Sequence, residues 1–221
     1  AGNLGISASE IKLNQGKLSA ETRQGAGGNV LLRNMRSLFL ENQSQISTST
    51  INGQGGNIGI SATEQIILGT NSLISSNATG TGNAGNIDLF SPQLSLQGNA
   101  QVSVSNTGTG NAGNLGISAS EIKLNQGKLS AETRQGAGGN VLLRNMRSLF
   151  LENQSQISTS TINGQGGNIG ISATEQIILG TNSLISSNAT GTGNAGNIDL
   201  FSPQLSLQGN AQVSVSNTGT G

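Results

Sequence analysis

The sequence predicts an all-β protein that folds as a parallel β-solenoid, with about 28 residues and three short strands in each coil. The first observation is repetition, because residues 1–110 recur without a single substitution as residues 112–221. The second is a regular alternation of apolar and polar residues, which is typical of strands with one buried face. The third is composition: glycine accounts for 34 of 221 residues and aromatic residues for 2%, which argues against an ordinary globular core.

A shorter repeat divides each of the two units into four coils. A Gly-Asn pair followed by an apolar residue begins a new segment at nearly equal intervals, at Gly2, Gly28, Gly56, Gly85 and Gly113. Such periods are typical of solenoids, in which one coil cannot bury its apolar face alone and stacks on its neighbours. We therefore expect two identical four-coil units, residues 1–111 and 112–221, that form one continuous stack of eight coils.

Three sets of positions recur from coil to coil and define the inward-facing columns of three strands. In the first strand they are Leu4, Ile6, Ala8, Val30, Leu32, Ile58, Ile60, Ile87 and Leu89. In the second strand they are Ile11, Leu13, Leu38, Leu40, Ile66, Leu68, Leu94 and Leu96. In the third strand they are Leu18, Ile46, Ile74 and Val102, with Ala20, Thr48, Ser76 and Val104 two residues later. No window shows the helical i, i+3, i+4, i+7 spacing, so we expect no helix, and eight coils would stack to roughly 38 Å.

Polar and glycine-rich segments separate the strands and form the corners of each coil. Residues 14–16 and 69–71 lie between the second and third strands, and their residue types accept positive φ or hydrogen bond to their own backbone. The third corner, which leads into the next coil, is longer, as at residues 80–84. We expect this corner to absorb most of the variation in coil length.

An asparagine follows the opening glycine in every coil. The eight residues are Asn3, Asn29, Asn57, Asn86, Asn114, Asn140, Asn168 and Asn197. One interpretation is a ladder in which stacked side-chain amides hydrogen bond from coil to coil inside the corner and satisfy buried backbone groups. The other is that asparagine after glycine merely suits a turn. We favour the ladder, because no coil uses the aspartate or serine that a turn would accept equally well.

The residues that enzymes and metal sites use are few and scattered. The chain has no cysteine and no histidine, which removes disulfides, thiolate ligands and the usual base of a serine nucleophile. Each unit has one aspartate, Asp88 in the first, while Glu10, Glu21, Glu41 and Glu64 align with different strands and corners. Polysaccharide cleavage requires clustered carboxylates. We therefore expect no catalytic residues, no metal site and no cofactor.

Charge and hydropathy argue against two classes of partner. The 10 basic and 10 acidic residues cancel to a net charge of +0 and are spread along the chain, so there is no basic patch for nucleic acid. No apolar run approaches the ~18 residues that a membrane-spanning helix needs. We expect neither nucleic-acid binding nor insertion into a membrane.

One outward-facing column of the second strand is a candidate for lateral contacts with other molecules. Phe39 and Ile67, and Phe150 and Ile178 in the second unit, would lie next to each other on adjacent coils. Exposed apolar neighbours of this kind can mark a contact surface. The alternative is that they are scattered surface residues without a role.

Two further sets of residues face outward from the other strands. The third strand carries a column of small polar residues that we expect to be ordinary solvent-facing surface. This column contains Ser19, Ser47, Ser75 and Ser103. On another face, Leu31 and Phe90 point outward from the first strand.

At this level of detail the repeats resemble a known family. Residues 82–89 read Gly-Asn-Ala-Gly-Asn-Ile-Asp-Leu, and residues 94–103 and a Thr-Gly-Thr-Gly corner follow. This combination resembles, over the whole chain, the repeat shaft of large filamentous-haemagglutinin-like exoproteins. The resemblance implies a right-handed parallel β-helix, exported by an outer-membrane transporter in two-partner secretion, that serves adhesion, aggregation or surface coating.

We therefore expect a non-enzymatic extracellular shaft or filament, secreted or at the cell surface, that projects from cells or links them. One alternative is a repetitive binding face for ice or glycans, built on the serine columns. Another is an engineered consensus scaffold, because perfect identity between units is unusual in an old repeat. The junction at residues 110–112 repeats the pattern found at both ends, so we also expect copies to stack end to end in a longer array or fibre.

Overall fold

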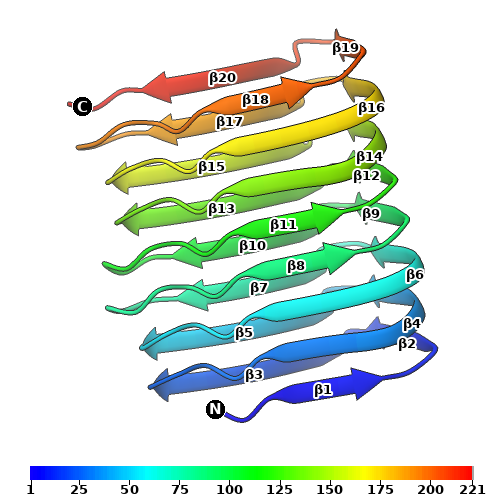
Figure 1. Cartoon of the computed structure of the whole chain (residues 1–221), viewed down its shortest axis with the longest axis vertical. Coiled ribbons are helices and arrows are strands. Elements are labelled where there is room, and N and C mark those ends of the chain that lie inside the picture. Colours follow the sequence, from blue (N-terminus) through cyan, green and yellow to red (C-terminus); the bar gives the residue numbers. More distant parts are fainter. Residues whose placement is uncertain (221) are drawn as a thin grey trace.

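The structure, a computed structural model, describes residues 1–220. These residues form a β-solenoid of about 8 turns with roughly 28 residues per turn and no helix. The all-β parallel solenoid predicted from the sequence is thus confirmed. Figure 1 shows that the coil is right-handed, with the N-terminus at one end of the stack and the C-terminus near the other.

Each coil contributes one strand, or one part of a long strand, to each of three faces. The strands of the first unit are β1 (Leu4–Ser7), β2 (Glu10–Asn14), β3 (Lys17–Gln24), β4 (Val30–Glu41), β5 (Gln45–Asn52), β6 (Ile58–Leu68), β7 (Leu73–Ala78), β8 (Ile87–Phe90), β9 (Gln93–Gln97) and β10 (Gln101–Asn106). Those of the second unit are β11 (Leu115–Ser118), β12 (Glu121–Asn125), β13 (Lys128–Gln135), β14 (Val141–Glu152), β15 (Gln156–Asn163), β16 (Ile169–Leu179), β17 (Leu184–Ala189), β18 (Ile198–Phe201), β19 (Gln204–Leu207) and β20 (Gln212–Asn217).

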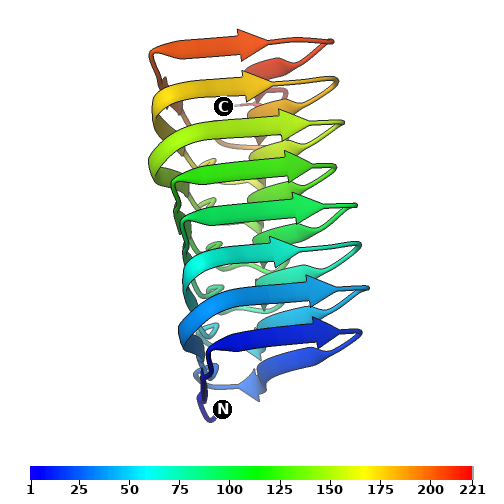
Figure 2. The same cartoon turned by 90° about the vertical axis from the view of Figure 1, so that its right-hand side faces the viewer.

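The faces form two parallel sheets that run the length of the stack. The 8-stranded sheet contains the third strand of every coil, in the order β20-β17-β15-β13-β10-β7-β5-β3. The 12-stranded sheet contains the first and second faces together, because β4, β6, β14 and β16 continue through the corner between them. Figure 2, turned by a quarter, shows the same regular stacking of one coil on the next.

The corner between the first and second faces differs from coil to coil. In coil 2 the chain stays in β4 but contains an irregularity around Met35, with Asn34 at a φ of 58°. An asparagine accepts this left-handed conformation more easily than most residues. In coil 4, Pro92 lies between β8 and β9, and proline has no N–H to donate to a ladder.

The expectation that the third corner absorbs most of the variation in coil length is wrong. Leu4 pairs in register with Val30, whereas Glu10 pairs with Ser37, so the first corner of coil 2 is longer than that of coil 1 by one residue. The registers of the later strands show that the second corner of coil 2 and the third corner of coil 3 each gain one residue in the same way. All three corners therefore vary, because a single insertion can bulge locally without disturbing the register of the strands that follow.

The interior is a column of apolar side chains stacked along the axis. All the inward positions predicted for coils 2 to 4 are buried, including the polar Thr48 and Ser76 at 0% exposure. In coil 1, Ile11 and Ala20 are buried, whereas the other inward positions are only half-buried, namely Leu4, Ile6, Ala8, Leu13 and Leu18. Coil 1 has a neighbour on one side only, so its apolar side chains lack half of their packing partners.

From coil 2 onward, the glycine at the opening of each coil is required by the close approach of the corner of the preceding coil. A Cβ atom on Gly56 would lie 2.0 Å from the carbonyl oxygen of Gly28, and one on Gly85 would lie 2.1 Å from that of Gly56. The same geometry recurs at Gly28, where the distance to the carbonyl oxygen of Gly2 is 2.0 Å. No side chain fits at these positions, so this column of glycines sets how closely the corners stack.

Buried hydroxyl groups satisfy the backbone of this glycine corner. The Thr48 hydroxyl donates to the carbonyl oxygen of Gly56 at 2.7 Å, and the Ser76 hydroxyl donates to the same oxygen at 3.0 Å. The Ser76 oxygen also accepts from the N–H of Gly85 at 3.0 Å. Polar residues in the third inward column thus provide partners for backbone groups that the corner removes from water.

The glycine column leads to a direct test in coil 3. We expect Gly56→Ala to destabilise the protein by at least about 2 kcal/mol, because its Cβ collides with a backbone oxygen that cannot rotate away. Gly59→Ala is the matched control in the same coil, since its Cβ would meet only the flexible Leu31 side chain at 3.1 Å. Urea unfolding followed by circular dichroism measures both. Equal stabilities for the two variants would show that the corner is not tightly stacked.

Candidate functional site

The eight asparagines form a continuous line of hydrogen bonds along one corner. The backbone N–H of each asparagine donates to the Oδ1 atom of the asparagine in the preceding coil, as in Asn29 to Asn3 at 2.9 Å and Asn57 to Asn29 at 2.8 Å. The other five such bonds measure 2.8 to 3.0 Å. The structure thus contains an asparagine ladder that passes from the first unit into the second without a break.

This ladder differs from the expected one in two respects. The side chains lie on the outside of the corner, where Asn57 and Asn86 are exposed, and they bond to backbone rather than to one another. Ordinary strand pairing begins one residue after each asparagine, where the N–H of Val30 donates to the carbonyl oxygen of Asn57. The asparagine side chain therefore stands in for a strand carbonyl at the position just before the sheet begins.

A neutral acceptor is needed for this arrangement to run through eight coils. Aspartate offers the same acceptor oxygen, but eight carboxylates in one column would stand ~4.8 Å apart. Each adjacent pair of carboxylates would then repel by about 1 kcal/mol in water. Asparagine avoids this repulsion in every coil.

The residues predicted for lateral contact lie together on the second face. Phe39 pairs in register with Ile67, and Phe150 with Ile178, and all four side chains are half-buried. A lysine from the preceding coil covers each ring, since the ammonium nitrogen of Lys12 is 5.4 Å from the centroid of Phe39. This contact is within the range of a cation–π interaction. It covers part of the apolar surface, and lateral contact through these residues stays a prediction.

In coils 2 and 3 the serine column of the third face is less exposed than expected, whereas Ser19 of coil 1 is exposed. Ser75 is 2% exposed and Ser47 is 9% exposed, although both point outward from the 8-stranded sheet. Longer outward side chains flank the column, and Asn77 donates a hydrogen bond to the Ser75 hydroxyl at 3.4 Å. Small side chains between larger ones lie at the floor of the surface, so these serines do not form a protruding array of hydroxyls.

The acidic residues stay apart in the fold, as their alignment predicts. Asp88 lies on the first face, Glu10 and Glu41 on the second, and Glu21 on the third. Among residues 1–220 there is no cluster of three or more acidic side chains that could hold a metal ion. Across the same residues, no helix has the length and apolar character needed to cross a membrane.

The first face has a feature that the sequence analysis missed, and we call it the ribbed face. Its two outward columns alternate small and large side chains from one coil to the next. The Gly/Leu/Asp column contains Gly5, Leu31, Gly59, Asp88, Gly116, Leu142, Gly170 and Asp199. The Ser/Arg/Phe column contains Ser7, Arg33, Ser61, Phe90, Ser118, Arg144, Ser172 and Phe201.

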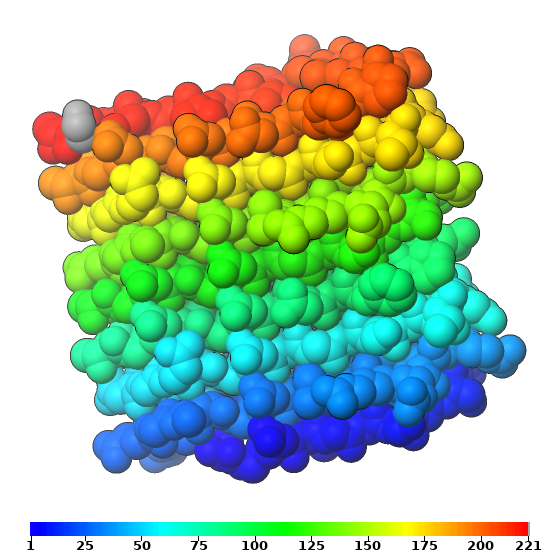
Figure 3. Space-filling view, in the orientation of Figure 1, coloured from blue at the N-terminus to red at the C-terminus, as the bar shows by residue number. Residues whose placement is uncertain are grey.

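Coils with large side chains form ribs, and coils with glycine and serine form grooves between them. The grooves beside the rib of Asp88 and Phe90 are continuous and enclose about 650 Å³. Their outer walls are the neighbouring ribs, where Arg33 and Arg144 project. Figure 3 shows this face filled with atoms, one band to each coil. The sequence predicts that Leu31 and Phe90 point outward. The alternation of small and large side chains becomes visible only when the outward columns of all coils are compared.

Comparison of the chain with protein-family models, with curated proteins and with solved structures finds no match.

The charge of the asparagine ladder provides a prediction. We expect a single Asn57→Asp substitution to change the free energy of unfolding by less than about 0.5 kcal/mol, because one carboxylate keeps the acceptor oxygen and has no charged neighbour in the ladder. The triple variant Asn29→Asp, Asn57→Asp and Asn86→Asp should lose about 1 to 2 kcal/mol at low ionic strength, since it contains two repelling pairs.

Thermal unfolding at neutral pH in low and high salt measures this effect. The deficit of the triple variant should shrink at ~1 M salt, where the screening length is ~3 Å. Asn57→Ala serves as the control that removes the acceptor without adding charge. A triple variant as stable as the single variant at low salt would contradict the coil-to-coil ladder.

Proposed function

We propose that the chain is a non-enzymatic structural shaft, an extracellular segment of an adhesin-like exoprotein that projects from the cell surface or links cells. One observation carries the proposal: the junction between the two units is stacked in the same way as the junctions inside a unit. Across it, β11 pairs with β8, β12 with β9 and β13 with β10, all in parallel. Units therefore add length without a change of direction or a linker.

The energetics of stacking favour such a role over that of a compact domain. Each coil contacts its two neighbours, so the stability of the array grows approximately as a sum over its coils and the interfaces between them. Each additional unit of four coils lengthens the rod by ~19 Å. Continuous ladders of backbone and asparagine hydrogen bonds resist bending between units. A rod whose reach depends on repeat number is suited to projection from a surface.

The resemblance to filamentous-haemagglutinin-like repeats supports the rest of the proposal. By that resemblance the chain is secreted through an outer-membrane transporter and acts outside the cell in adhesion or aggregation. Copies of the unit continue the stack in a longer array or by end-to-end association. Among the alternatives, an ice- or glycan-binding face on the serine column receives little support, because Ser47 and Ser75 in its middle are buried.

The surface role is tested in the source organism. Antibodies raised against the two-unit chain should label intact cells, and protease treatment of intact cells should remove the label. Deletion of the gene should reduce attachment or cell–cell aggregation, and complementation should restore both. Labelling only after the cells are permeabilised would contradict an extracellular shaft.

The additive geometry makes a prediction that does not depend on the organism. Chains with two, three and four units should behave in small-angle X-ray scattering as rods of constant cross-section whose length rises by ~19 Å per unit. Their mean residue circular dichroism should be unchanged. A maximum dimension that stops growing after the second unit would show that units fold back on one another rather than extend.

A further inference from the structure

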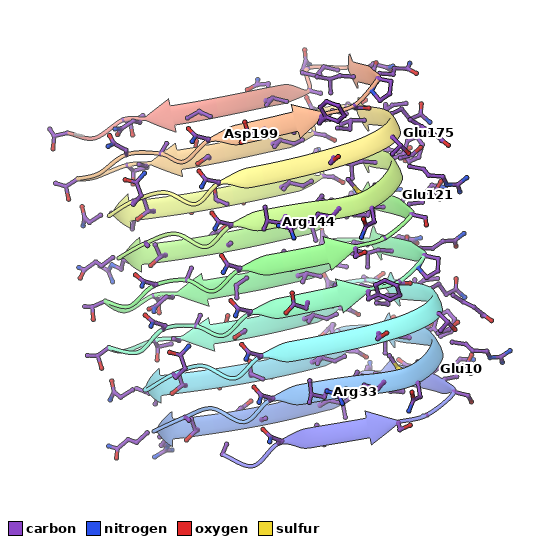
Figure 4. All side chains as sticks on the ribbon, in the orientation of Figure 1. Glu10, Arg33, Glu121, Arg144, Glu175 and Asp199 are labelled. Carbon is purple, nitrogen blue, oxygen red and sulfur yellow. The ribbon has the colours of Figure 1, made fainter. Side chains whose placement is uncertain are left out.

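The ribbed face carries four charged side chains in a regular order. From the N-terminal end they are Arg33, Asp88, Arg144 and Asp199, and Figure 4 labels three of them, Arg33, Arg144 and Asp199, along the same face. Each lies on a rib, so that successive charges are opposite in sign and separated by two coils, or ~9.6 Å along the axis. Among residues 1–220, these four side chains take part in no ion pair or side-chain hydrogen bond.

Apolar side chains share the ribs with these charges. Phe90 is 54% exposed and Phe201 is 75% exposed, and they lie beside Asp88 and Asp199 respectively. Leu31 occupies the same rib as Arg33. The face thus combines exposed rings, single charges of alternating sign, and grooves floored by glycine and serine. Exposed apolar surface with unpaired charges around it is typical of a protein interaction site.

We propose that the ribbed face binds the ribbed face of a second copy of this chain, with the two solenoid axes parallel and the copies shifted by one coil. The second copy is rotated by half a turn about an axis parallel to the solenoids. Because ribs occur at every second coil, the shift of one coil places each rib of one copy opposite a groove of the other. Without the shift, ribs would meet ribs.

The half-turn also determines which side chains meet. It reverses the strand direction and therefore exchanges the two outward columns. Arg33 of the second copy then lies in the Gly/Leu/Asp column of the first, between Leu31 and Asp88. Likewise, Asp88 of the second copy lies in the Ser/Arg/Phe column, between Phe90 and Arg144. Three of the four arginines of the pair thus face an aspartate, and three of the four phenylalanines contact a leucine, the exceptions lying at the two ends.

The opposite choice of axis direction fits the charges less well. Rotation about the strand direction makes the axes antiparallel and leaves the columns unexchanged. Asp88 of the second copy would then share a column with Asp88 or Leu142 of the first, and arginine would share a column with phenylalanine. Like charges placed opposite each other are unfavourable. The order of the charges therefore favours parallel axes.

The size of the face sets the strength of the contact. Eight coils and a strand of four residues give a flat area of roughly 500 Å² per copy, and about 1,000 Å² in total is the lower limit for a specific interface. Exposed ion pairs add little affinity but select register and partner. Two copies of the two-unit chain therefore pair weakly. Each added unit extends the same interface, so that longer arrays associate side by side more tightly.

A polysaccharide is a less suitable occupant than a second copy. Sugars are recognised through aromatic ring faces, and the groove of about 650 Å³ offers a single ring, that of Phe90, beside floors of glycine and serine. Alternating positive and negative charges also offer no consistent complement to a neutral or an anionic sugar chain. The same alternation matches a copy of itself.

Charge reversal provides the test. An acidic-face chain carries Arg33→Asp and Arg144→Asp, and a basic-face chain carries Asp88→Arg and Asp199→Arg. Sedimentation velocity should show concentration-dependent dimers for the unmodified chain. Each variant alone should dimerise at least about tenfold more weakly, because all its ribs carry one sign, and an equal mixture of the two should recover association to the unmodified level or above. Circular dichroism confirms that both variants fold.

Two further variants separate shape from charge and one face from another. Gly59→Leu with Gly170→Leu fills two grooves and should abolish pairing without displacing any charge, because a Cβ atom at either position meets only a leucine side chain. Phe39→Ser with Phe150→Ser changes the second face and should leave pairing unaffected. Binding of a neutral glucan and of an acidic uronan to the unmodified chain is measured in parallel by isothermal titration calorimetry.

Several results would overturn the proposal. These are a chain that stays monomeric up to millimolar concentration, a mixture of variants that fails to associate, or a loss of pairing only in the Phe39 and Phe150 variant. If the unmodified chain does not pair but binds a polysaccharide, and the groove-filling variant loses that binding, the face would be assigned to sugars instead. Pairing is tested on purified chains only, so it can be refuted while the role as an extracellular shaft stands. That role can likewise be refuted while the pairing stands.

Discussion

The contact between successive coils is the interaction on which the rest of the structure depends. Identical residues in different coils show its effect directly. Leu94 is 2% exposed inside the stack, whereas Leu205, the same residue of the second unit, is 49% exposed in the last described coil. Val104 and Val215 differ in the same way, at 0% and 55%. A coil has no interior of its own, and its side chains become a core only when another coil covers them.

This dependence explains which residue types occupy each column. Glycine opens each stacked coil because the corner of the preceding coil passes too close for a Cβ atom. Asparagine follows because its side chain supplies an acceptor where strand pairing has not yet begun. Small hydroxyl residues such as Thr48 and Ser76 occupy the inward positions nearest that corner, where they bond to its backbone. A stack of similar coils places each such requirement at the same position in every repeat. Similar segments therefore recur along the chain.

Much of the fold was predictable because the pattern repeats. A single alternation such as that of residues 58–60 is ambiguous, but eight copies at matching positions define three inward columns, and the structure buries them. Details that depend on the third dimension were not predictable. The sequence does not reveal that Asn57 points outward, that Ser75 lies below longer neighbours, or how corner bulges distribute the variation in coil length. The ribbed face was within reach of the sequence, because Gly59 and Asp88 share an outward column, but only a register-by-register comparison displays it.

The central claim, that neighbouring coils rather than local sequence stabilise each coil, is tested most directly by comparing identical coils in one molecule. Strands β1–β3 and β11–β13 have the same sequence but lie at the end and in the middle of the stack. Ligation of a ¹⁵N-labelled unit to an unlabelled one makes the two copies distinguishable, and native-state hydrogen exchange by NMR then gives the opening free energy of each amide. Amides of β11–β13 should exchange at least about 100-fold more slowly than those of β1–β3, because opening a middle coil breaks contacts on both sides. Equal exchange rates in the two copies would contradict the claim.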